Sequence, residues 1–305
     1  MFYAFFYVAI GIAIRIFFKN VKLRNHHNVL SDKPLIIVSN HPSAFMDPLV
    51  HSIFVKYPLY YLARADVFSS KFGAWIAKKS HMAPIYRKVE DGVDSLKRND
   101  EVFDECYRLL ANNKTILLFG EGLTDDTFVR RIKPLKKGTV RIALGVENKY
   151  DFNLGVNIVC AGLNYSNPSE FRSDILISFS EPIDVRRYKK LFEENSNKAM
   201  RMLNEEIYKR IKNEVVYLED ENLDEFFEQL LIISGKGMSN KTVNNNHKLV
   251  DRWKYSVDLA NKINQLNNED KLFVAGLKEE TSGYFKKLNN INVDDSSVYE
   301  FGSAK

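Results

Sequence analysis

Short apolar runs alternate with longer segments of helical period between residues 35 and 183. Each run is bounded by turn residues, which is typical of buried strands. The runs expected to form strands are residues 35–38, 59–63, 81–87, 115–119, 155–163 and 174–179. Helices are expected between them at residues 49–55, 68–78, 93–112 and 139–145. This alternation predicts an α/β fold with a mostly parallel central sheet covered by helices.

The first 18 residues, MFYAFFYVAIGIAIRIFF, are apolar except for Arg15. This length is at the lower bound for crossing a bilayer. Lys19, Lys22 and Arg24 follow at once and would hold that end at the cytoplasmic face of a membrane. A signal peptide is disfavoured, because there is neither a basic start nor a small-residue cleavage site. We therefore expect residues 1–20 to form a membrane-associated helix that either spans the bilayer or lies in its interface. The alternative is a buried core helix.

After residue 185 the composition shifts to Lys, Glu and Asn with helical period. Helices are expected at residues 197–215, 222–233, 247–266 and 270–288, with a linker near residues 234–246 and a frayed, irregular end over 292–305. The chain is thus predicted to contain residues 1–20 as the membrane-associated helix, 21–218 as the α/β domain and 219–305 as a helical C-terminal extension without catalytic motifs.

Composition excludes several classes of function. Cys106 and Cys160 are too few for a disulfide framework, so a reducing compartment is expected. The net charge of +5 is modest and favours an anionic partner. No Gly-x-Gly-x-x-Gly or Walker-type loop points to a nucleotide cofactor. The basic residues lack the interleaved aromatic residues that stack on bases, so no nucleic-acid partner is expected. His26 and His27 have no carboxylate or cysteine at ligand spacing, and no metal site is predicted.

A histidine and an aspartate follow the first expected strand of the α/β domain. His41 lies in the loop after residues 35–38, and Asp47 lies in the helix that Pro42 is expected to begin. In open α/β sheets this edge carries the ligand crevice. From the loop, the His41 ring can fold back onto the Asp47 carboxylate, which would fix its tautomer and leave the other nitrogen as a base. The alternative is a helix cap beside a histidine that is merely hydrogen-bonded.

Four blocks in order resemble the phospholipid/glycerol acyltransferase family, which moves a fatty acyl group from a thioester to a glycerol-phosphate hydroxyl. The blocks are NHPSAFMD at 40–47, APIYR at 83–87, LFGEGLT at 118–124 followed by LKKG at 135–138, and NIVCAGLNY at 157–165. The resemblance covers residues 35–183. It implies that residues 21–218 are the acyltransferase domain of a glycerol-3-phosphate or 1-acylglycerol-3-phosphate O-acyltransferase-like enzyme.

Three departures from the family pattern are visible. Five residues separate His41 from Asp47 where four are common, which resembles the branch that acts on glycerol-3-phosphate and dihydroxyacetone phosphate. Phe-Pro-Glu-Gly-Thr reads Phe-Gly-Glu-Gly-Leu, and Cys160 replaces a proline. None removes a charged group, so we interpret them as changes of shape. Further membrane segments often follow the domain in this branch; none is found here, so we expect a C-terminal portion to be missing.

The resemblance also assigns binding roles. The match to the second block makes Arg87 the candidate for the acceptor phosphate, because a guanidinium can clamp phosphate oxygens in two places. By spacing alone it would be a surface arginine. The family role of the Glu-Gly pair, carried to Glu121 and Gly122, is to bind the acyl acceptor; the alternative is a tight turn. Backbone N–H groups at Gly120 and Gly122 are oxyanion candidates.

Six cations lie within residues 130–141, next to the Glu-Gly loop. Such a run is usually a solvated face. Because it opens an expected helix, we assign Lys133 and above all Lys137 to the acceptor phosphate or to the phosphopantetheine end of the donor.

The expected reaction uses His41 as general base and Asp47 as its partner, with no covalent intermediate, metal or cofactor. The expected partners are membrane lipids, acyl-CoA or acyl carrier protein as donor, and a glycerol-phosphate acceptor. The expected location is a membrane, with the catalytic domain on the cytoplasmic face. Two alternatives remain open: a hydrolase using His41, Asp47 and Glu121, with or without a metal, and a catalytically silent protein that binds lysolipid at a membrane surface.

Overall fold

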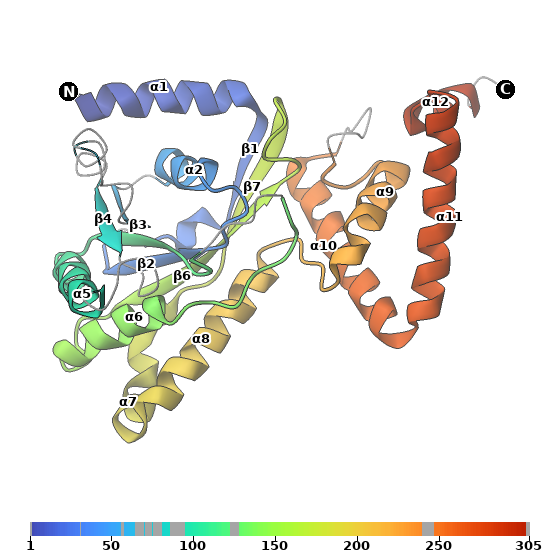
Figure 1. Ribbon diagram of the computed structural model, residues 1–305. Helices are drawn as coiled ribbons and strands as arrows, with labels where there is room; N and C mark the ends of the chain where they lie inside the picture. Colours follow the sequence, from blue (N-terminus) through green and yellow to red (C-terminus); the bar gives the residue numbers. More distant parts are fainter. Residues whose placement is uncertain are drawn as a thin grey trace.

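A mixed sheet forms the centre of the protein (Figure 1). The computed structural model describes residues 2–30, 32–55, 58–64, 70, 75, 81–85, 95–122, 128–239 and 247–302. The strands are β1 (Phe18–Arg24), β2 (Leu35–Ser39), β3 (Leu59–Arg64), β4 (Met82–Ile85), β5 (Thr115–Phe119), β6 (Asn157–Tyr165), β7 (Ser173–Phe179) and β8 (Ile183–Asp184). Within the described residues they form one sheet in the order β1-β7-β6-β2-β5-β3-β4, with β8 paired to β6.

Most neighbouring strands run parallel, as expected. β2 pairs in parallel with β5 and β6, β3 with β4 and β5, and β1 with β7. β7 and β8 run antiparallel to β6. The α/β fold is confirmed and the sheet is mixed, because β6 returns into β7 through a short connection rather than through a helical crossover.

The sequence pattern did not predict β1. Its residues were interpreted as the basic flank of the N-terminal helix, yet they form an edge strand beside β7. Phe18 is buried, while Lys19 and Asn20 are exposed, as an edge position allows. Asn20 Nδ2 donates to Asp174 Oδ1 at 2.7 Å, which ties β1 to β7. The predicted boundary at residue 20 therefore falls inside a strand.

Helices cover both faces of the sheet. They are α1 (Phe2–Phe17), α2 (Met46–Phe54), α5 (Ser95–Ala111), α6 (Gly138–Lys149), α7 (Lys189–Glu194) and α8 (Ser196–Asn213). The alternation along β2 sets the two cores: Leu35 and Ile37 pack with α1 and α2, while Ile36 and Val38 pack with α5, α6 and α8. A strand that is buried on both faces has no polar side to show, which explains the unbroken apolar runs in the sequence.

The N-terminal helix is present, over Phe2–Phe17. Ile14 packs in the core, and Tyr7 Oη donates to the carbonyl oxygen of Ile53 in α2 at 3.2 Å. The helix ends where the chain enters β1. Among the helices that the structure describes, none is both long enough and apolar enough to cross a bilayer.

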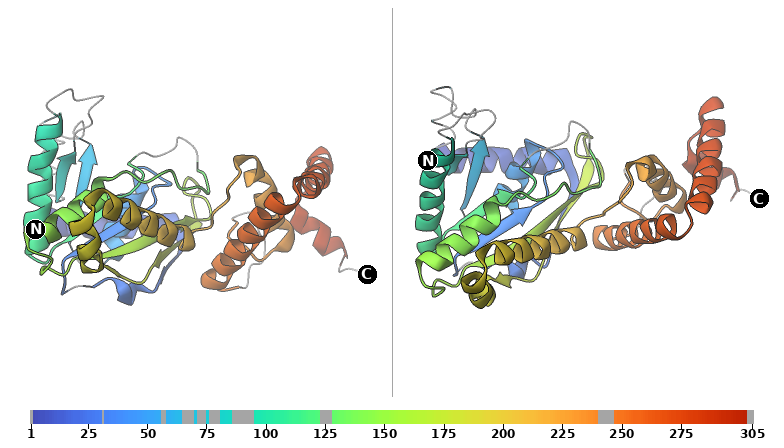
Figure 2. Two further views of the ribbon diagram at one scale, coloured as in Figure 1. Left: turned by 90° about the horizontal axis from the view of Figure 1, so that it is seen from below. Right: turned by 60° about the horizontal axis from the view of Figure 1, so that its bottom comes forward.

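The C-terminal region is helical and packs beside the β1–β7 edge (Figure 2). It contains α9 (Asp224–Ser234), α10 (Leu249–Glu269), α11 (Lys271–Asn290) and α12 (Asp295–Gly302). Arg252 of α10 forms a buried ion pair with Asp174 of β7, at 2.5 Å between Nη1 and Oδ2. The helices expected here are confirmed, but the irregular end expected over 292–305 is wrong, since α12 forms within it.

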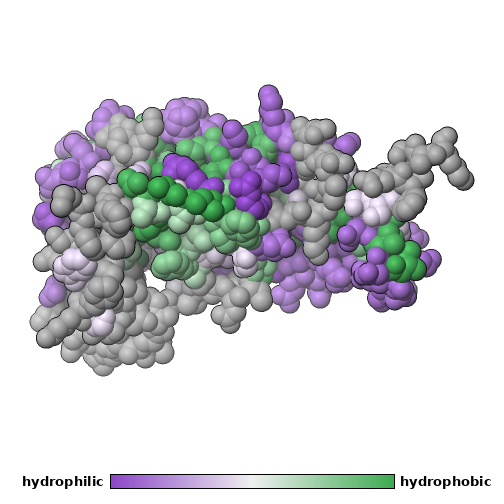
Figure 3. Space-filling view, turned by 90° about the horizontal axis from the view of Figure 1, so that it is seen from above, coloured by the Kyte–Doolittle hydropathy of each residue, from purple (hydrophilic) through white to green (hydrophobic). Residues whose placement is uncertain are grey.

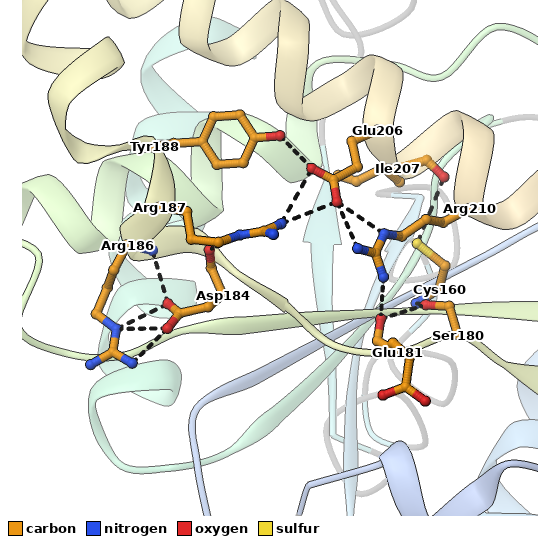
Figure 4. Close-up of polar contacts among 10 residues, drawn as sticks. All are labelled: Cys160, Ser180, Glu181, Asp184, Arg186, Arg187, Tyr188, Glu206, Ile207 and Arg210. Atoms are coloured by element: carbon orange, nitrogen blue, oxygen red, sulfur yellow. Dashed lines mark hydrogen bonds and ion pairs between the residues drawn. The ribbon is translucent and has the colours of Figure 1, made fainter.

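Polar contacts hold α8 against the turn after β8 (Figure 4). The Glu206 carboxylate of α8 accepts from Tyr188 Oη at 2.5 Å and from Arg187 Nη2 at 3.1 Å. Beneath it, the Cys160 N–H donates to Ser180 Oγ at 3.0 Å. Cys160 stands where the resembling family has proline, and a proline could not make this bond.

Candidate active site

His41 and Asp47 meet at the carboxyl edge of the parallel strands. His41 follows β2, and Asp47 lies in the first turn of α2. The chain between them makes a turn in which the N–H groups of Met46 and Asp47 both donate to the carbonyl oxygen of Ser43. Pro42 lies before this turn and not at the start of the helix, where the sequence had placed it. His41 Nδ1 lies 2.8 Å from Asp47 Oδ2.

Burial differs across this pair. The Asp47 side chain is 0% exposed and that of His41 is 16% exposed. The carboxylate can only accept, so it fixes the tautomer with the proton on Nδ1 and leaves Nε2 as the basic nitrogen. The His41 ring also stacks on Phe119 at the end of β5, with 3.9 Å between centroids and 11° between planes. The ring is thus held by one hydrogen bond and one stacking contact.

Two further donors hold the Asp47 carboxylate. The Ser43 N–H donates to Oδ2 at 2.8 Å, and Tyr165 Oη donates to Oδ1 at 2.7 Å. Tyr165 is the last residue of β6 and is buried. Burial, and then the neighbouring Asp47 charge, raise the pKa of Tyr165 well above 10. The phenol therefore stays neutral and can donate.

Glu121 joins two backbone segments beside the histidine. Its Oε1 accepts the His41 N–H at 3.0 Å, and its Oε2 accepts the Lys133 N–H at 2.8 Å. Burial raises the pKa of Glu121, and the two backbone hydrogen bonds oppose the rise. The expected acceptor-binding role of Glu121 stays a prediction; what the structure adds is that its carboxylate anchors the His41 backbone.

The two glycines around Glu121 shape a tight loop. The Gly120 N–H donates to the Ser39 carbonyl at 3.1 Å, and the Gly122 N–H to the Phe119 carbonyl at 3.1 Å. Gly122 has φ 67°, and a Cβ on Gly120 would lie 2.8 Å from Leu135 Cδ2. Both N–H groups thus bond to backbone oxygens here, and the oxyanion role stays a prediction that would require one of these bonds to open.

The cation run divides into two parts. Arg131 makes a bidentate pair with Asp224 of α9, at 2.8 Å for both bonds, and Arg130 pairs with Glu228 at 3.1 Å. These two guanidinium groups hold the loop against the C-terminal region. Lys137 is exposed and directly precedes α6. Arg87 lies outside the described residues, so its expected phosphate contact is untested.

A buried histidine, which the sequence reading did not single out, lies behind the pair. His51 of α2 is wholly buried, with Nε2 at 3.1 Å from Ser39 Oγ. Burial, and then the nearby His41, lower the pKa of His51 to about 3. Neither His51 nor Tyr165 was assigned a role from the sequence. Two signals for Tyr165 were available: it ends the fourth motif block, and it lies at the carboxyl end of an apolar strand, where a polar group can reach the crevice.

No metal cluster is visible in the part of the chain that the structure describes. There, no three side chains of His, Cys, Asp or Glu are grouped so that they could hold a metal ion. His26 and His27 lie exposed in a short 3₁₀ turn.

Parts of this chain match known acyltransferases in sequence. Residues 20–162 match the family described as Acyltransferase. Over 84 residues, 28% of this chain, the sequence is 36% identical to Glycerol-3-phosphate O-acyltransferase 1 of Saccharomyces cerevisiae and 31% identical to an uncharacterized acyltransferase of Schizosaccharomyces pombe. These matches cover 11% and 12% of the relatives, so the chain spans a small part of their length. The crystal structure of the 1-acyl-sn-glycerophosphate (LPA) acyltransferase PlsC from Thermotoga maritima aligns with a TM-score of 0.46 and 19% identity, over 67% of this chain and 76% of that one.

Proposed function

We propose, on the premise that residues 20–162 belong to the acyltransferase family, that this chain moves a fatty acyl group from a thioester to a hydroxyl of a glycerol-phosphate acceptor. The observation that carries the proposal is the His41–Asp47 pair, with a buried carboxylate and a partly exposed imidazole. This arrangement suits proton removal from a hydroxyl, and it does not require a serine or cysteine nucleophile.

The chemistry follows from the free ring nitrogen. His41 Nε2 takes the hydroxyl proton while the acceptor oxygen attacks the thioester carbonyl carbon. Asp47 stabilises the imidazolium that forms. When the tetrahedral intermediate collapses, the C–S bond breaks and the leaving thiolate takes the proton from His41. The products are an ester and a thiol, and the histidine returns to its starting state.

The acceptor phosphate is assigned to the cations around the Glu121 loop. Lys137 is exposed just before α6, where the backbone N–H groups of a helix start also favour an anion. Lys133 is held next to the site through its backbone bond to Glu121. Arg87 completes the set proposed from the sequence. The five-residue spacing between His41 and Asp47 favours a small acceptor, glycerol-3-phosphate or dihydroxyacetone phosphate, over a lysophosphatidate.

The outer face of α1 supports association with a membrane interface. Val8, Ile12 and Ile16 recur every fourth residue and are 57%, 55% and 56% exposed. Figure 3 shows hydrophobic residues gathered over this helix. Exposed Lys19 follows the helix, as a cation that meets anionic headgroups would. Such a surface would hold the catalytic domain at the cytoplasmic face of a membrane. The active site would then lie next to the acyl chains and the lipid product.

The test is acyl transfer in detergent, with labelled acyl-CoA or acyl carrier protein as donor. Glycerol-3-phosphate, dihydroxyacetone phosphate and 1-acyl-glycerol-3-phosphate are offered side by side. We expect transfer that falls by at least about 10²-fold in His41→Ala and is unchanged in the matched control His27→Ala, an exposed histidine. Full transfer by His41→Ala would overturn the mechanism. Release of free fatty acid in place of transfer would favour a hydrolase, and binding of lysolipid without turnover would favour a silent protein.

A further inference from the structure

Tyr165 is the one described side chain other than His41 that donates a hydrogen bond to the Asp47 carboxylate. We propose that it is a positioning residue of the acyl transfer: by holding Asp47 Oδ1, it orients Oδ2 toward the His41 ring and limits the basicity of that ring. The proposal rests on the proposed function, and it assigns a role to a residue that does not touch the substrate.

The position of the hydroxyl is fixed from several sides. Tyr165 is 0% exposed, and its ring packs against Phe18 of β1, with 5.7 Å between centroids. Its backbone is in β6, which pairs with β7 at Ile175. Because a buried ring is closely packed on all sides, few rotamers are available to it. The Oη–Oδ1 distance of 2.7 Å is that of a strong hydrogen bond to an ionised group.

The two oxygens of Asp47 are therefore used in two different ways. Oδ2 faces the His41 ring and the Ser43 N–H, whereas Oδ1 faces Tyr165. Without the phenol, the carboxylate can rotate about its terminal torsion, which is soft, and Oδ1 is left buried without this donor. The carboxylate then carries more of its charge toward His41. A more negative partner favours the protonated imidazole.

The other charged groups facing His41 set the background for this effect. Glu121 lies on the loop after β5 and accepts the His41 backbone N–H. The backbone N–H of Lys133 donates to the other oxygen of that carboxylate. His51 lies behind on α2 and is neutral above pH 3, because burial lowers its pKa to about 3. None of these groups changes in Tyr165→Phe, so a shift in the His41 titration reports on Asp47.

The test compares Tyr165→Phe with Tyr61→Phe. Tyr61 is a matched control: it is buried in the same core cluster, and its hydroxyl contacts Ser52 of α2 instead of Asp47. We expect Tyr165→Phe to lower kcat by about 10-fold or more with little change in KM, as for loss of a hydrogen bond to a charged group. In the pH profile of kcat/KM, the apparent pKa on the acid side should rise by about one unit. Tyr61→Phe should change neither kcat nor the pH profile of kcat/KM.

An NMR titration of the His41 imidazole separates this proposal from the proposed function, because it needs no substrate. A higher His41 pKa in Tyr165→Phe supports the positioning role even if no acceptor is turned over. An unchanged His41 pKa, with only a lower unfolding temperature, would overturn it and leave Tyr165 a structural residue. In the Asp47→Asn background, adding Tyr165→Phe should shift the His41 pKa no further, since both act through one carboxylate.

Wild-type protein supplies a second measurement should Tyr165→Phe fail to fold. The buried Tyr165 hydroxyl proton should give a slowly exchanging downfield resonance that moves as His41 is titrated. A resonance that stays fixed through that titration would contradict the proposal.

Discussion

The Glu121 carboxylate reaches His41 through the backbone: Oε1 accepts the His41 N–H at 3.0 Å, while the imidazole bonds to Asp47. The same carboxylate accepts the Lys133 N–H, so one side chain links the loop after β2 to the cation-rich loop before α6. Two carboxylates thus act on one histidine, Asp47 on the ring and Glu121 on the main chain.

Glu121→Gln should therefore weaken the site without removing a ring contact. The amide has one acceptor oxygen, and its NH₂ group must face the second backbone N–H. We expect the free energy of unfolding to fall by about 1–3 kcal/mol, as for a buried donor left unsatisfied, and transfer activity to fall with it. Urea unfolding and steady-state rates measure both. Glu105→Gln, at an exposed ion pair with Arg108, is the control and should stay within about 0.5 kcal/mol of wild type. Equal behaviour of the two variants would contradict the anchoring role.

His51 should make the protein sensitive to acid. Burial lowers its pKa from 6.5 to about 3. As pH falls, the ring is therefore protonated in the unfolded chain before it is protonated in the folded protein. Stability is then complete above pH 6.5 and is lost as pH falls from 6.5 toward 3, by about 1.4 kcal/mol per pH unit from this residue. His51→Gln keeps a polar group near Ser39 and does not titrate. Denaturant unfolding at several pH values should show a flatter profile for it, whereas exposed His27→Gln should retain the wild-type slope.

Gly162 lies where β6 meets the end of α8. A Cβ there would stand 2.1 Å from the carbonyl oxygen of Glu214, which is backbone and has little room to move. Gly162→Ala should lower the free energy of unfolding by about 1–3 kcal/mol or more. Gly276→Ala in α11 meets nothing within 4 Å and should raise stability by up to about 1 kcal/mol. Thermal unfolding of the two variants checks the contrast, and a Gly162→Ala chain as stable as wild type would show that the close approach can relax.

The helix α9, in the C-terminal region, should contribute to acceptor binding through Arg131. Asp224→Asn removes one half of the bidentate pair, so we expect a stability loss of about 1 kcal/mol, since the pair is partly exposed. The loop that carries Lys133 would also gain freedom, and the acceptor KM should rise more than kcat falls. Glu193→Gln, at an exposed pair 4.0 Å from Lys189, is the control. An unchanged acceptor KM in Asp224→Asn would show that α9 does not contribute to acceptor binding.

The apolar face of α1 can be tested with anionic lipid vesicles. Ile12→Glu replaces an exposed residue at the centre of that face, so it should fold normally and bind vesicles at least about 10-fold more weakly. Leu272→Glu on α11, where the side chain is 87% exposed, introduces the same charge far from α1 along the chain and should bind as wild type does. Co-sedimentation measures the difference; similar loss in both variants would point to net charge instead of α1.

Local sequence chemistry was enough to locate the central strands and the helices of the C-terminal region. Residues such as Leu35 to Val38 are apolar on both faces because the strand is covered on both, and that pattern is visible without a structure. The pairing of His41 with Asp47 was also predictable, since both residues lie within one short loop and helix start. The order of the four motifs also indicated a resemblance to the acyltransferase family.

Contacts between distant segments were decided by the tertiary structure alone. β1 was missed because its polar edge residues resemble the basic flank of a membrane helix. They form a strand only because β7 provides a pairing partner. Tyr165 lies 118 residues from Asp47, Glu121 lies 80 from His41, and the pairing of Arg131 with Asp224 spans 93. The apolar periodicity of a segment indicates which face of the helix or strand a residue occupies. It does not indicate which distant residue that side chain contacts. The sequence thus determined the elements and the local His–Asp pair. The packing of β6 and of the Glu121 loop against that pair determined how the pair is held.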